Sequence, residues 1–274
     1  MLVAAIIPAK DEAGRIGKVL INSRGWAPDI IIVVVNGCKD ETLGEVLTTC
    51  PPNTHIIEFD DPLGIDIPRA IGAKYAYDLG ADIFVFLDGD MSGALAPTML
   101  QLIGGIKRGS DVALVNCYPY ITKRLPLTEK MLYFRKMLNQ ELGLLGSLGA
   151  ASTSHGPHAI SRKLLSKIGL PPLATPPVEL AMARGIDSVI KVHAALPHIE
   201  LSSQIRTTTH SMLVAETIIG DCIEAIHLAK GMPRSRVWEG VEYDGYHSQR
   251  RWDLLKVAQN NLDLVKIISI NGTE

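Results

Sequence analysis

The sequence predicts an α/β protein, with a mostly parallel, Rossmann-like sheet flanked by helices and a helical C-terminal extension. Three apolar runs of strand length, Leu2–Ile7, Ile30–Val35 and Ile83–Leu87, have the composition of strands that are covered on both faces. The segments between them carry apolar residues at helical spacing. Strands that alternate with helices in this way form parallel sheets with right-handed crossovers.

The length and charge of the chain restrict its class. Its 274 residues fit one α/β domain with an appendage, and we place the domain at 1–205 and the extension at 206–274. The formal net charge is -2, with acidic and basic residues interspersed, which argues against nucleic acid and anionic lipid as partners. We therefore expect small molecules as partners.

Cysteine spacing and apolar run length bear on location. The four cysteines show no paired short spacing, which argues against a zinc site or a disulfide scaffold and suits a reducing cytosol. No apolar run approaches the roughly 20 residues that span a bilayer. The first strand has no basic leader and stops at Pro8, unlike a signal peptide. We expect a cytoplasmic protein with no transmembrane segment.

The first half of the chain alternates strands with helices. The loop Pro8–Glu12 leads into a helix that Asp11 is expected to cap. The other elements expected before residue 120 are a helix ending near Cys50, a strand over His55–Phe59, helices over Ile67–Leu79 and Ala96–Gly109, and a strand over Val112–Cys117.

The second half begins with a helix over Thr128–Leu145 and continues with a glycine-rich stretch, Gly146–His158. The backbone amides of this stretch would approach a ligand closely, or the stretch is a flexible connection. Within it, His155 and His158 either contact an acceptor phosphate or line a turn. The next expected elements are a short helix over Val178–Gly185 and a strand over Asp187–Ala194.

From Thr207 the pattern changes to long helices. Two are expected, His210–Gly231 and roughly Gly245–Ile268, and no further strand for the sheet. This extension would fold back on the sheet domain or form a subunit interface, so a homodimer through these helices is one expectation.

Polar loops follow three of the predicted strands, at Pro8–Glu12, Asn36–Asp40 and Asp88–Asp90. In a parallel sheet such loops open on the carboxyl edge of the strands, and ligands bind there where the strand order reverses. The three loops, far apart in sequence, should therefore form one pocket.

The usual glycine-rich cradles for dinucleotides and for P-loop phosphates do not occur in the sequence. A phosphate bound at this pocket would instead need a metal ion at Asp90 and cationic side chains such as Lys10 or Arg69. Paired acids at a strand end can hold such a divalent cation, because hard cations prefer oxygen ligands.

Taken together, these loops resemble the motifs of GT-A glycosyltransferases, in particular the family 2-like enzymes that use nucleotide-diphosphate sugars. Pro8–Glu12 resembles their Pro-Ala-Leu-Asn-Glu loop, Asn36–Thr42 resembles Asp-Gly-Ser-Thr-Asp-Gly-Thr, and Asp88-Gly-Asp90 falls on the Asp-x-Asp signature. Arg69-Ala-Ile-Gly72 is similar to the arginine-bearing helix before that signature. Order and spacing match over about the first 110 residues.

The second half is similar to a narrower group. Pro177-Val-Glu-Leu180 resembles the Gly-Val-Glu-Ile of the retaining glucosyl-3-phosphoglycerate synthases, and His210 lies where these enzymes place a metal-binding histidine. Gly156–Arg162 resembles the acceptor-side segment of the family. The sequence departs from the family at Lys10, which is usually apolar, and at Gly64–Asp66, which lacks a Gly-Lys-Gly.

The resemblance implies a hexosyltransferase that moves a sugar from a UDP- or GDP-sugar to a hydroxyl acceptor. It implies that Asp90 and His210 ligate Mg²⁺ or Mn²⁺, which offsets the charge on the leaving nucleoside diphosphate. Glu179 would act as a base or as an orienting carboxylate, and Arg69 would support the phosphates. The implied donor-binding residues are Pro8, Ala9, Lys10, Glu12, Asn36, Asp88 and Gly89.

Each candidate also has a structural interpretation. Asp88 and Asp90 are typical of a strand that ends in a turn, and Glu12 of the first turn of a helix. Glu179 is compatible with a solvated helix face, and His210 with a structural histidine.

Two other functions are compatible with a similar sheet. The first is a nucleotidyltransferase that makes nucleotide sugars, although the chain lacks a Gly-x-Gly-Thr-Arg type loop after its first strand. The second is a non-catalytic protein that binds a nucleotide sugar and metal without turnover.

Overall fold

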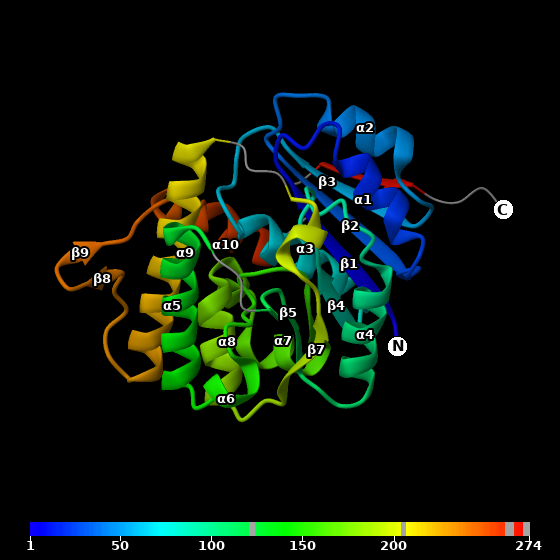
Figure 1. Cartoon of the computed structure of the whole chain (residues 1–274). Coiled ribbons are helices and arrows are strands. Elements are labelled where there is room, and N and C mark those ends of the chain that lie inside the picture. Colours follow the sequence, from blue (N-terminus) through cyan, green and yellow to red (C-terminus); the bar gives the residue numbers. More distant parts are fainter. Residues whose placement is uncertain (121–123, 204–206, 261–265, 271–274) are drawn as a thin grey trace.

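A computed structural model of the chain describes residues 1–120, 124–203, 207–260 and 266–270, and it shows an α/β fold built on one large sheet (Figure 1). In the described part of the chain this sheet has eight strands, in the order β10-β3-β2-β1-β4-β6-β5-β7. The strands are β1 (Val3–Ala9), β2 (Ile30–Asn36), β3 (Thr54–Phe59), β4 (Ile83–Phe86), β5 (Val112–Asn116), β6 (His158–Ser161), β7 (Ile190–Ala195) and β10 (Lys266–Ile270).

Helices cover both faces of the sheet. They are α1 (Ile16–Ser23), α2 (Thr42–Thr49), α3 (Ile67–Asp78), α4 (Ala96–Lys107), α5 (Pro126–Glu141), α6 (Leu145–Leu148), α7 (Arg162–Ile168), α8 (Pro176–Gly185), α9 (Thr208–Ala229) and α10 (Trp252–Asn260). The smaller elements are 3-10 turns at Pro171–Ala174, His198–Leu201 and His247–Gln249, and a hairpin of β8 (Val237–Trp238) and β9 (Val241–Glu242).

The predicted mostly parallel sheet is confirmed. β1 pairs in parallel with β2 and β4, β2 with β3, and β5 with β7. β6 is antiparallel to both of its neighbours, β4 and β5, and β10 is antiparallel to β3. β6 starts at His158, where the sequence indicated the end of a glycine-rich loop.

The central strands are apolar throughout because both of their faces are covered. Alternate residues of β2 belong to two separate cores, with Ile32 and Val34 in the core that includes α3, and Ile31 and Val33 in the core that includes α1. A strand buried on one face would alternate apolar with polar residues instead. Burial on both faces explains why these strands could be predicted from continuous apolar runs in the sequence.

The strand order places the carboxyl ends of β1 and β4 side by side. From β1 the chain moves outward to β2 and β3, and then returns to the other side of β1 with β4. A sheet of this order has its switch point between β1 and β4, which is where a crevice for a ligand forms.

The structure corrects the expectation that Asp11 caps the first helix. Asp11 has a left-handed backbone conformation (φ 53°), and its Oδ1 accepts a hydrogen bond from the backbone N–H of Lys39 at 2.8 Å. α1 begins later, at Ile16, and no side chain caps its first residue. The acid therefore ties the loop after β1 to the loop after β2.

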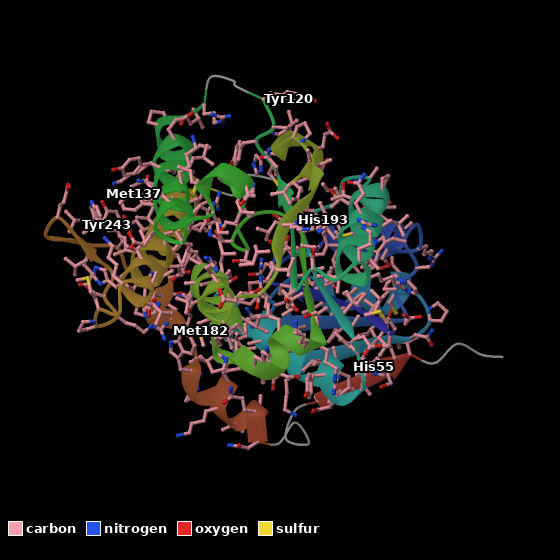
Figure 2. The ribbon with its side chains drawn as sticks, turned by 90° about the horizontal axis from the view of Figure 1, so that it is seen from below. His55, Tyr120, Met137, Met182, His193 and Tyr243 are labelled. Carbon is pink, nitrogen blue, oxygen red and sulfur yellow. The ribbon has the colours of Figure 1, made fainter. Side chains whose placement is uncertain are left out.

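The expectation of a purely helical C-terminal extension is wrong. In place of a helix over Gly245–Ile268, the described residues form α10 and then β10, which adds to the edge of the main sheet beside β3. His55 of β3 lies at this edge, and its Nδ1 is 2.9 Å from the Oγ of Ser269 (Figure 2). The boundary between 205 and 206 lies outside the described residues.

A helix that crosses a bilayer must be both long and apolar. None of the helices in the described ranges is both long enough and apolar enough to do so.

Candidate active site

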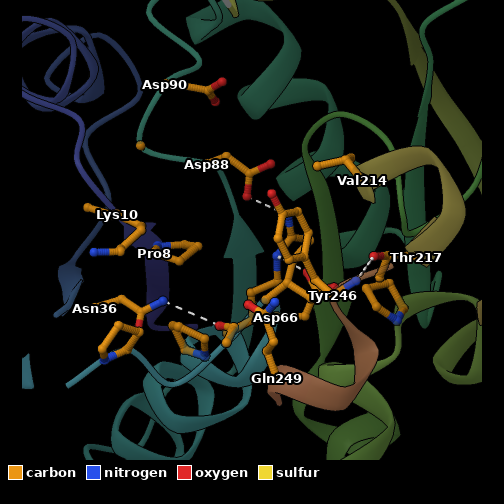
Figure 3. Close-up of a pocket in the computed structure, with 18 of the residues that line it drawn as sticks. Pro8, Lys10, Asn36, Asp66, Asp88, Asp90, Val214, Thr217, Tyr246 and Gln249 are labelled. Carbon is orange, nitrogen blue, oxygen red and sulfur yellow. Dashed lines mark hydrogen bonds and ion pairs between the residues drawn. The ribbon is translucent and has the colours of Figure 1, made fainter. Parts of the chain in front are cut away.

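A cavity of about 460 Å³ lies at the carboxyl ends of β1, β2 and β4 (Figure 3). The loops after these strands form one wall. The residues around Asp66 and the start of α3 form the floor, and α9 with the segment after β9 forms the opposite wall. The three loops that were predicted to meet do meet at this cavity.

Almost all of the predicted site residues line this cavity. Those that do are Pro8, Ala9, Lys10, Glu12, Asn36, Arg69, Asp88, Gly89, Asp90 and His210. Glu179 is not among the lining residues, and neither are His155 and His158.

Gly89 allows the loop after β4 to approach β1 closely. Its backbone N–H donates to the carbonyl oxygen of Pro8 at 3.1 Å. A Cβ at this position would lie 2.9 Å from the same oxygen and 3.3 Å from the Cβ of Ala9. Since neither atom belongs to a flexible side chain, the Asp-Gly-Asp sequence needs its glycine to hold the two acids against this strand.

Two side chains hold the loops after β1 and β2 together. Lys10 donates from Nζ to the carbonyl oxygen of Gly37 and forms an ion pair with Asp11. Glu12 is buried, its carboxylate accepts from Arg15 Nε at 2.7 Å, and its backbone N–H donates to the hydroxyl of Thr42. Lys10 and Glu12 are therefore part of a wall that is already fixed by local contacts.

Asn36 fixes the floor of the cavity. Its Oδ1 accepts from the backbone N–H of Leu63 at 2.6 Å, and its Nδ2 donates to the carbonyl oxygen of Gly64 at 3.3 Å (Figure 3). The amide thus pairs with one backbone donor and one backbone acceptor of the loop that precedes α3. This arrangement requires an amide, because a carboxylate would repel the carbonyl oxygen.

Arg69 contacts two acids of the cavity. Its guanidinium forms an ion pair with Asp88 through Nη2, and its Nε lies 3.2 Å from Oδ1 of Asp66. Burial disfavours the charge on Arg69, but Asp88 and Asp66 outweigh burial and raise its pKa. Burial also raises the pKa of Asp66, against the lowering effect of Arg69 and Arg250. Arg69 therefore fixes the orientation of Asp88.

Asp90 and His210 come from opposite walls of the cavity. Asp90 follows β4, and His210 lies in the first turn of α9, where its Nδ1 is 2.8 Å from the hydroxyl oxygen of Tyr246. One carboxylate and one imidazole are a donor set that accepts Mg²⁺ or Mn²⁺ when phosphate oxygens complete the coordination. The donor types present are those that the predicted site requires, and ligation of a metal by Asp90 and His210 stays a prediction.

Acidic groups outnumber basic ones among the described lining residues. The bases are Lys10 and Arg69, whereas the acids are Asp11, Glu12, Asp66, Asp88, Asp90 and Asp221. Arginines next to the lining offset much of this charge, since Arg15 pairs with Glu12 and Arg250 pairs with Asp66 and Asp221.

Among the described residues, two groups of side chains have metal-ligand spacing, with ligand atoms within 4.8 Å of one another, and neither group contains Asp90 or His210. They are Asp11, Cys38 and Asp40, and Asp221, Glu224 and His247. In the first group the carboxylates accept from backbone amides, and in the second they are paired with arginines. Asp90 and His210 stay the metal ligands that the resemblance implies.

Glu179 lies in the first turn of α8 and is buried, with 1% of its surface exposed, which excludes the solvated helix face. Its Oε2 is 3.8 Å from Nε2 of the equally buried His158, whose ring stacks on Phe86 of β4. The Glu179 charge also contributes to raising the pKa of Arg69. Glu179 therefore lies behind the cavity wall.

His155 lies in a separate polar cluster beside the cavity. Its Nδ1 is 3.1 Å from Nη1 of Arg135, and its Nε2 is 3.1 Å from Nδ1 of His198. Burial lowers the pKa of His155 well below its ordinary value, and the charge of Arg135 lowers it further. Ser154, which binds the same guanidinium, does line the cavity.

Sequence reasoning missed the wall formed by α9 and the segment after β9. Thr217, Asp221, Tyr246 and Gln249 line the cavity, and they lie in stretches that the sequence indicated as plain helix. The Asp244-Gly245 pair is a local turn signal in this region. Nothing in the pattern of this region indicated that it lines the cavity.

No protein-family model matches the chain, and no curated protein matches it. Solved structures do match, over 85% of the chain and with TM-scores of 0.60 to 0.62 in two examples. These matches, with the sheet order described above, identify the fold as the GT-A type of glycosyltransferases and confirm the predicted fold class.

The particular structures that the chain resembles include glucosyl-3-phosphoglycerate synthase from Mycobacterium tuberculosis. Its complex with Mn²⁺, UDP-glucose and phosphoglyceric acid has 18% sequence identity and a TM-score of 0.62, covering 85% of this chain and 81% of that one. Its complex with UDP has 19% identity and a TM-score of 0.60, covering 85% and 82%. A crystal structure described as a mycobacterial protein has 19% identity and a TM-score of 0.61, covering 85% and 76%.

Proposed function

We propose that the protein is a glycosyltransferase that moves a sugar from a nucleotide-diphosphate sugar to a hydroxyl acceptor, with a divalent metal ion. The observation that carries this proposal is the meeting of Asp90 and His210 with the loops after β1 and β2 around one cavity. The similar synthase structures hold Mn²⁺, UDP-glucose and phosphoglyceric acid, which supports the same class of ligands here.

In this proposal Asp90 and His210 hold Mg²⁺ or Mn²⁺. The bound metal supplies Lewis-acid stabilisation of the negative charge that develops on the leaving diphosphate. The acids Asp88 and Asp90 at the end of β4 support this, because divalent cations prefer hard oxygen ligands. Asp88, whose orientation Arg69 fixes, would contact the ribose of the donor or lie beside the metal site.

The nucleoside of the donor would lie against the wall made by Pro8, Ala9 and Glu12. Asn36 supports that wall indirectly, since its amide is engaged by the backbone of Leu63 and Gly64. Lys10 is a basic side chain of this wall that lines the cavity. It would contribute to donor binding when a ligand replaces the carbonyl oxygen of Gly37 as its partner.

For Glu179 we propose a positioning role in place of the base considered from sequence. Glu179 is buried and does not line the cavity, so a positioning role suits its place in the structure better than that of a base in contact with the acceptor. Its negative charge favours the charged form of Arg69, which in turn orients Asp88.

The cytoplasmic location and the homodimer stay predictions.

The proposal is tested by thermal denaturation with UDP- and GDP-sugars, each with and without Mn²⁺. A ligand that binds only the native state stabilises it by about 2.7 kcal/mol when its concentration is about a hundred times its Kd. For a chain of this size each kcal/mol raises Tm by roughly 2–4 °C, so the shift is easily measured. We expect a shift that needs the metal and that Asp90→Ala abolishes.

Asp78→Ala is the matched control, because Asp78 forms an exposed pair with Lys74 away from the cavity. It should keep the full ligand-induced shift. Identical shifts for wild type and Asp90→Ala would contradict the proposal. Release of nucleoside diphosphate identifies a transferase, whereas pyrophosphate exchange would identify a nucleotidyltransferase, and binding without turnover a non-catalytic protein.

A further inference from the structure

Tyr246 joins the predicted metal ligand His210 to a rigid wall of the cavity. Its hydroxyl oxygen lies 2.8 Å from Nδ1 of His210, and the two rings are 5.6 Å apart between centroids and tilted by 46°. Both residues line the cavity, and Tyr246 is labelled on the wall opposite Lys10 and Pro8 in Figure 3.

The backbone of Tyr246 is anchored on α9. Its N–H donates to the hydroxyl of Thr217 at 2.7 Å. The preceding residue, Gly245, has φ +57°, and a Cβ there would collide with the carbonyl oxygen of Leu213 and with Thr217. A glycine is thus needed for the segment to come close enough to the helix for the tyrosine to reach His210.

The other end of the segment is fixed by Arg250, whose side chain is fully buried. Its guanidinium donates to both carboxylate oxygens of Asp221 on α9, at 2.8 and 2.7 Å, and lies 3.2 Å from Asp66 on the cavity floor. The segment that carries Tyr246 therefore bridges α9 and the loop before α3. A side chain held at both ends of its segment is well placed to orient a ligand of a metal.

We propose that Tyr246 is a positioning residue for the metal site, which sets the ring orientation and the tautomer of His210. The inference rests on the proposed function, because it assumes that His210 ligates the metal. A hydrogen bond from Nδ1–H to the tyrosine hydroxyl places the lone pair of the neutral imidazole on Nε2, the nitrogen that then ligates. Such partners of ligating histidines typically contribute 10- to 100-fold to metal affinity.

The direction of this hydrogen bond changes with the metal. A phenol can also donate to Nδ1, and the imidazole then carries its proton on Nε2, a tautomer that cannot ligate through that atom. Metal on Nε2 therefore selects the form in which Nδ1–H donates and the tyrosine oxygen accepts. A tyrosine that only fills space would show no such coupling.

The experiment compares wild type with Tyr246→Phe, which keeps the ring and removes the hydroxyl. Calorimetric titration with Mn²⁺ should show roughly 10- to 100-fold weaker binding by the variant. In ¹⁵N spectra of histidine-labelled wild type with Mg²⁺, His210 should be protonated at Nδ1. Tyr77→Phe is the control, because it removes a hydroxyl that contacts Ser166 on the surface, and its metal affinity should equal that of wild type.

Thr217→Val removes the anchor of the Tyr246 backbone and should also weaken Mn²⁺ binding. It serves as the second variant if Tyr246→Phe does not fold. Less than a threefold change in Mn²⁺ affinity for Tyr246→Phe, or an Nε2-protonated His210 in the Mg²⁺-bound protein, overturns the inference while leaving the proposed function intact. Failure of wild type to bind Mn²⁺ would instead overturn both.

Discussion

Replacement of the buried Arg250 by methionine should destabilise the protein strongly. The Arg250 side chain is fully buried, and it pairs with Asp221 through two hydrogen bonds and with Asp66 through a third. Burial disfavours its charge, but Asp221 and then Asp66 outweigh burial and raise its pKa. Methionine has a similar length and leaves two buried carboxylates with one cationic partner fewer.

Removing one partner of a buried ion pair costs about 3–5 kcal/mol, because the remaining charge stays buried. The loss of unfolding free energy should lie toward the lower end of this range, because Asp221 still pairs with Arg236 and Asp66 still pairs with Arg69. At roughly 2–4 °C per kcal/mol, Tm should fall by at least about 6 °C. Urea denaturation followed by circular dichroism measures the same loss as a lower midpoint.

Arg251→Met is the matched control, one residue further along the chain. Arg251 pairs with Asp253 on the surface, where both side chains are largely exposed, so its replacement should change stability very little. The reasoning is refuted if Arg250→Met loses no more stability than Arg251→Met, since burial would then not decide the cost of losing the pair.

Two further predictions concern pH and the Asp-Gly-Asp loop. Folding lowers the pKa of His155 below its ordinary value of 6.5, so the native state binds fewer protons than the unfolded chain below that pH. The contribution of His155 to the free energy of unfolding is therefore complete above pH 6.5 and falls as the pH decreases. His155→Gln should therefore reduce the difference in urea midpoint between pH 7.5 and pH 5, and an unchanged difference would contradict this. Gly89→Ala should push the loop away from Pro8 and weaken metal-dependent donor binding at least tenfold, measured by calorimetry, and wild-type affinity would show that the close approach is not needed.

The sheet and the first wall of the site were predictable because their signals are local. The continuous apolar runs reflect burial on both faces, and in a parallel sheet the position of each loop follows from the strand before it. Once the loops after β1, β2 and β4 were assigned to one edge, the meeting of Lys10, Asn36 and Asp88 followed from topology alone.

The C-terminal strand was not predictable, because the interaction that decides its structure is not local. Lys266–Ile270 is a five-residue run whose composition suits a strand or the end of a helix, and periodicity does not separate the two over so short a length. The free edge of β3 decides the outcome, because its unpaired backbone groups accept an antiparallel partner.

The sequence by itself determined the fold class, the carboxyl edge as the place of the cavity, and the acids and amide that line its first wall. Tertiary structure alone decided that Glu179 is buried behind the wall, that Tyr246 contacts His210, and that Arg250 bridges Asp66 and Asp221. The physical reason is separation along the chain: Arg250 and Asp66 are 184 positions apart. Backbone periodicity carries no record of a contact between side chains that distant, so such ion pairs appear only when the chain is folded.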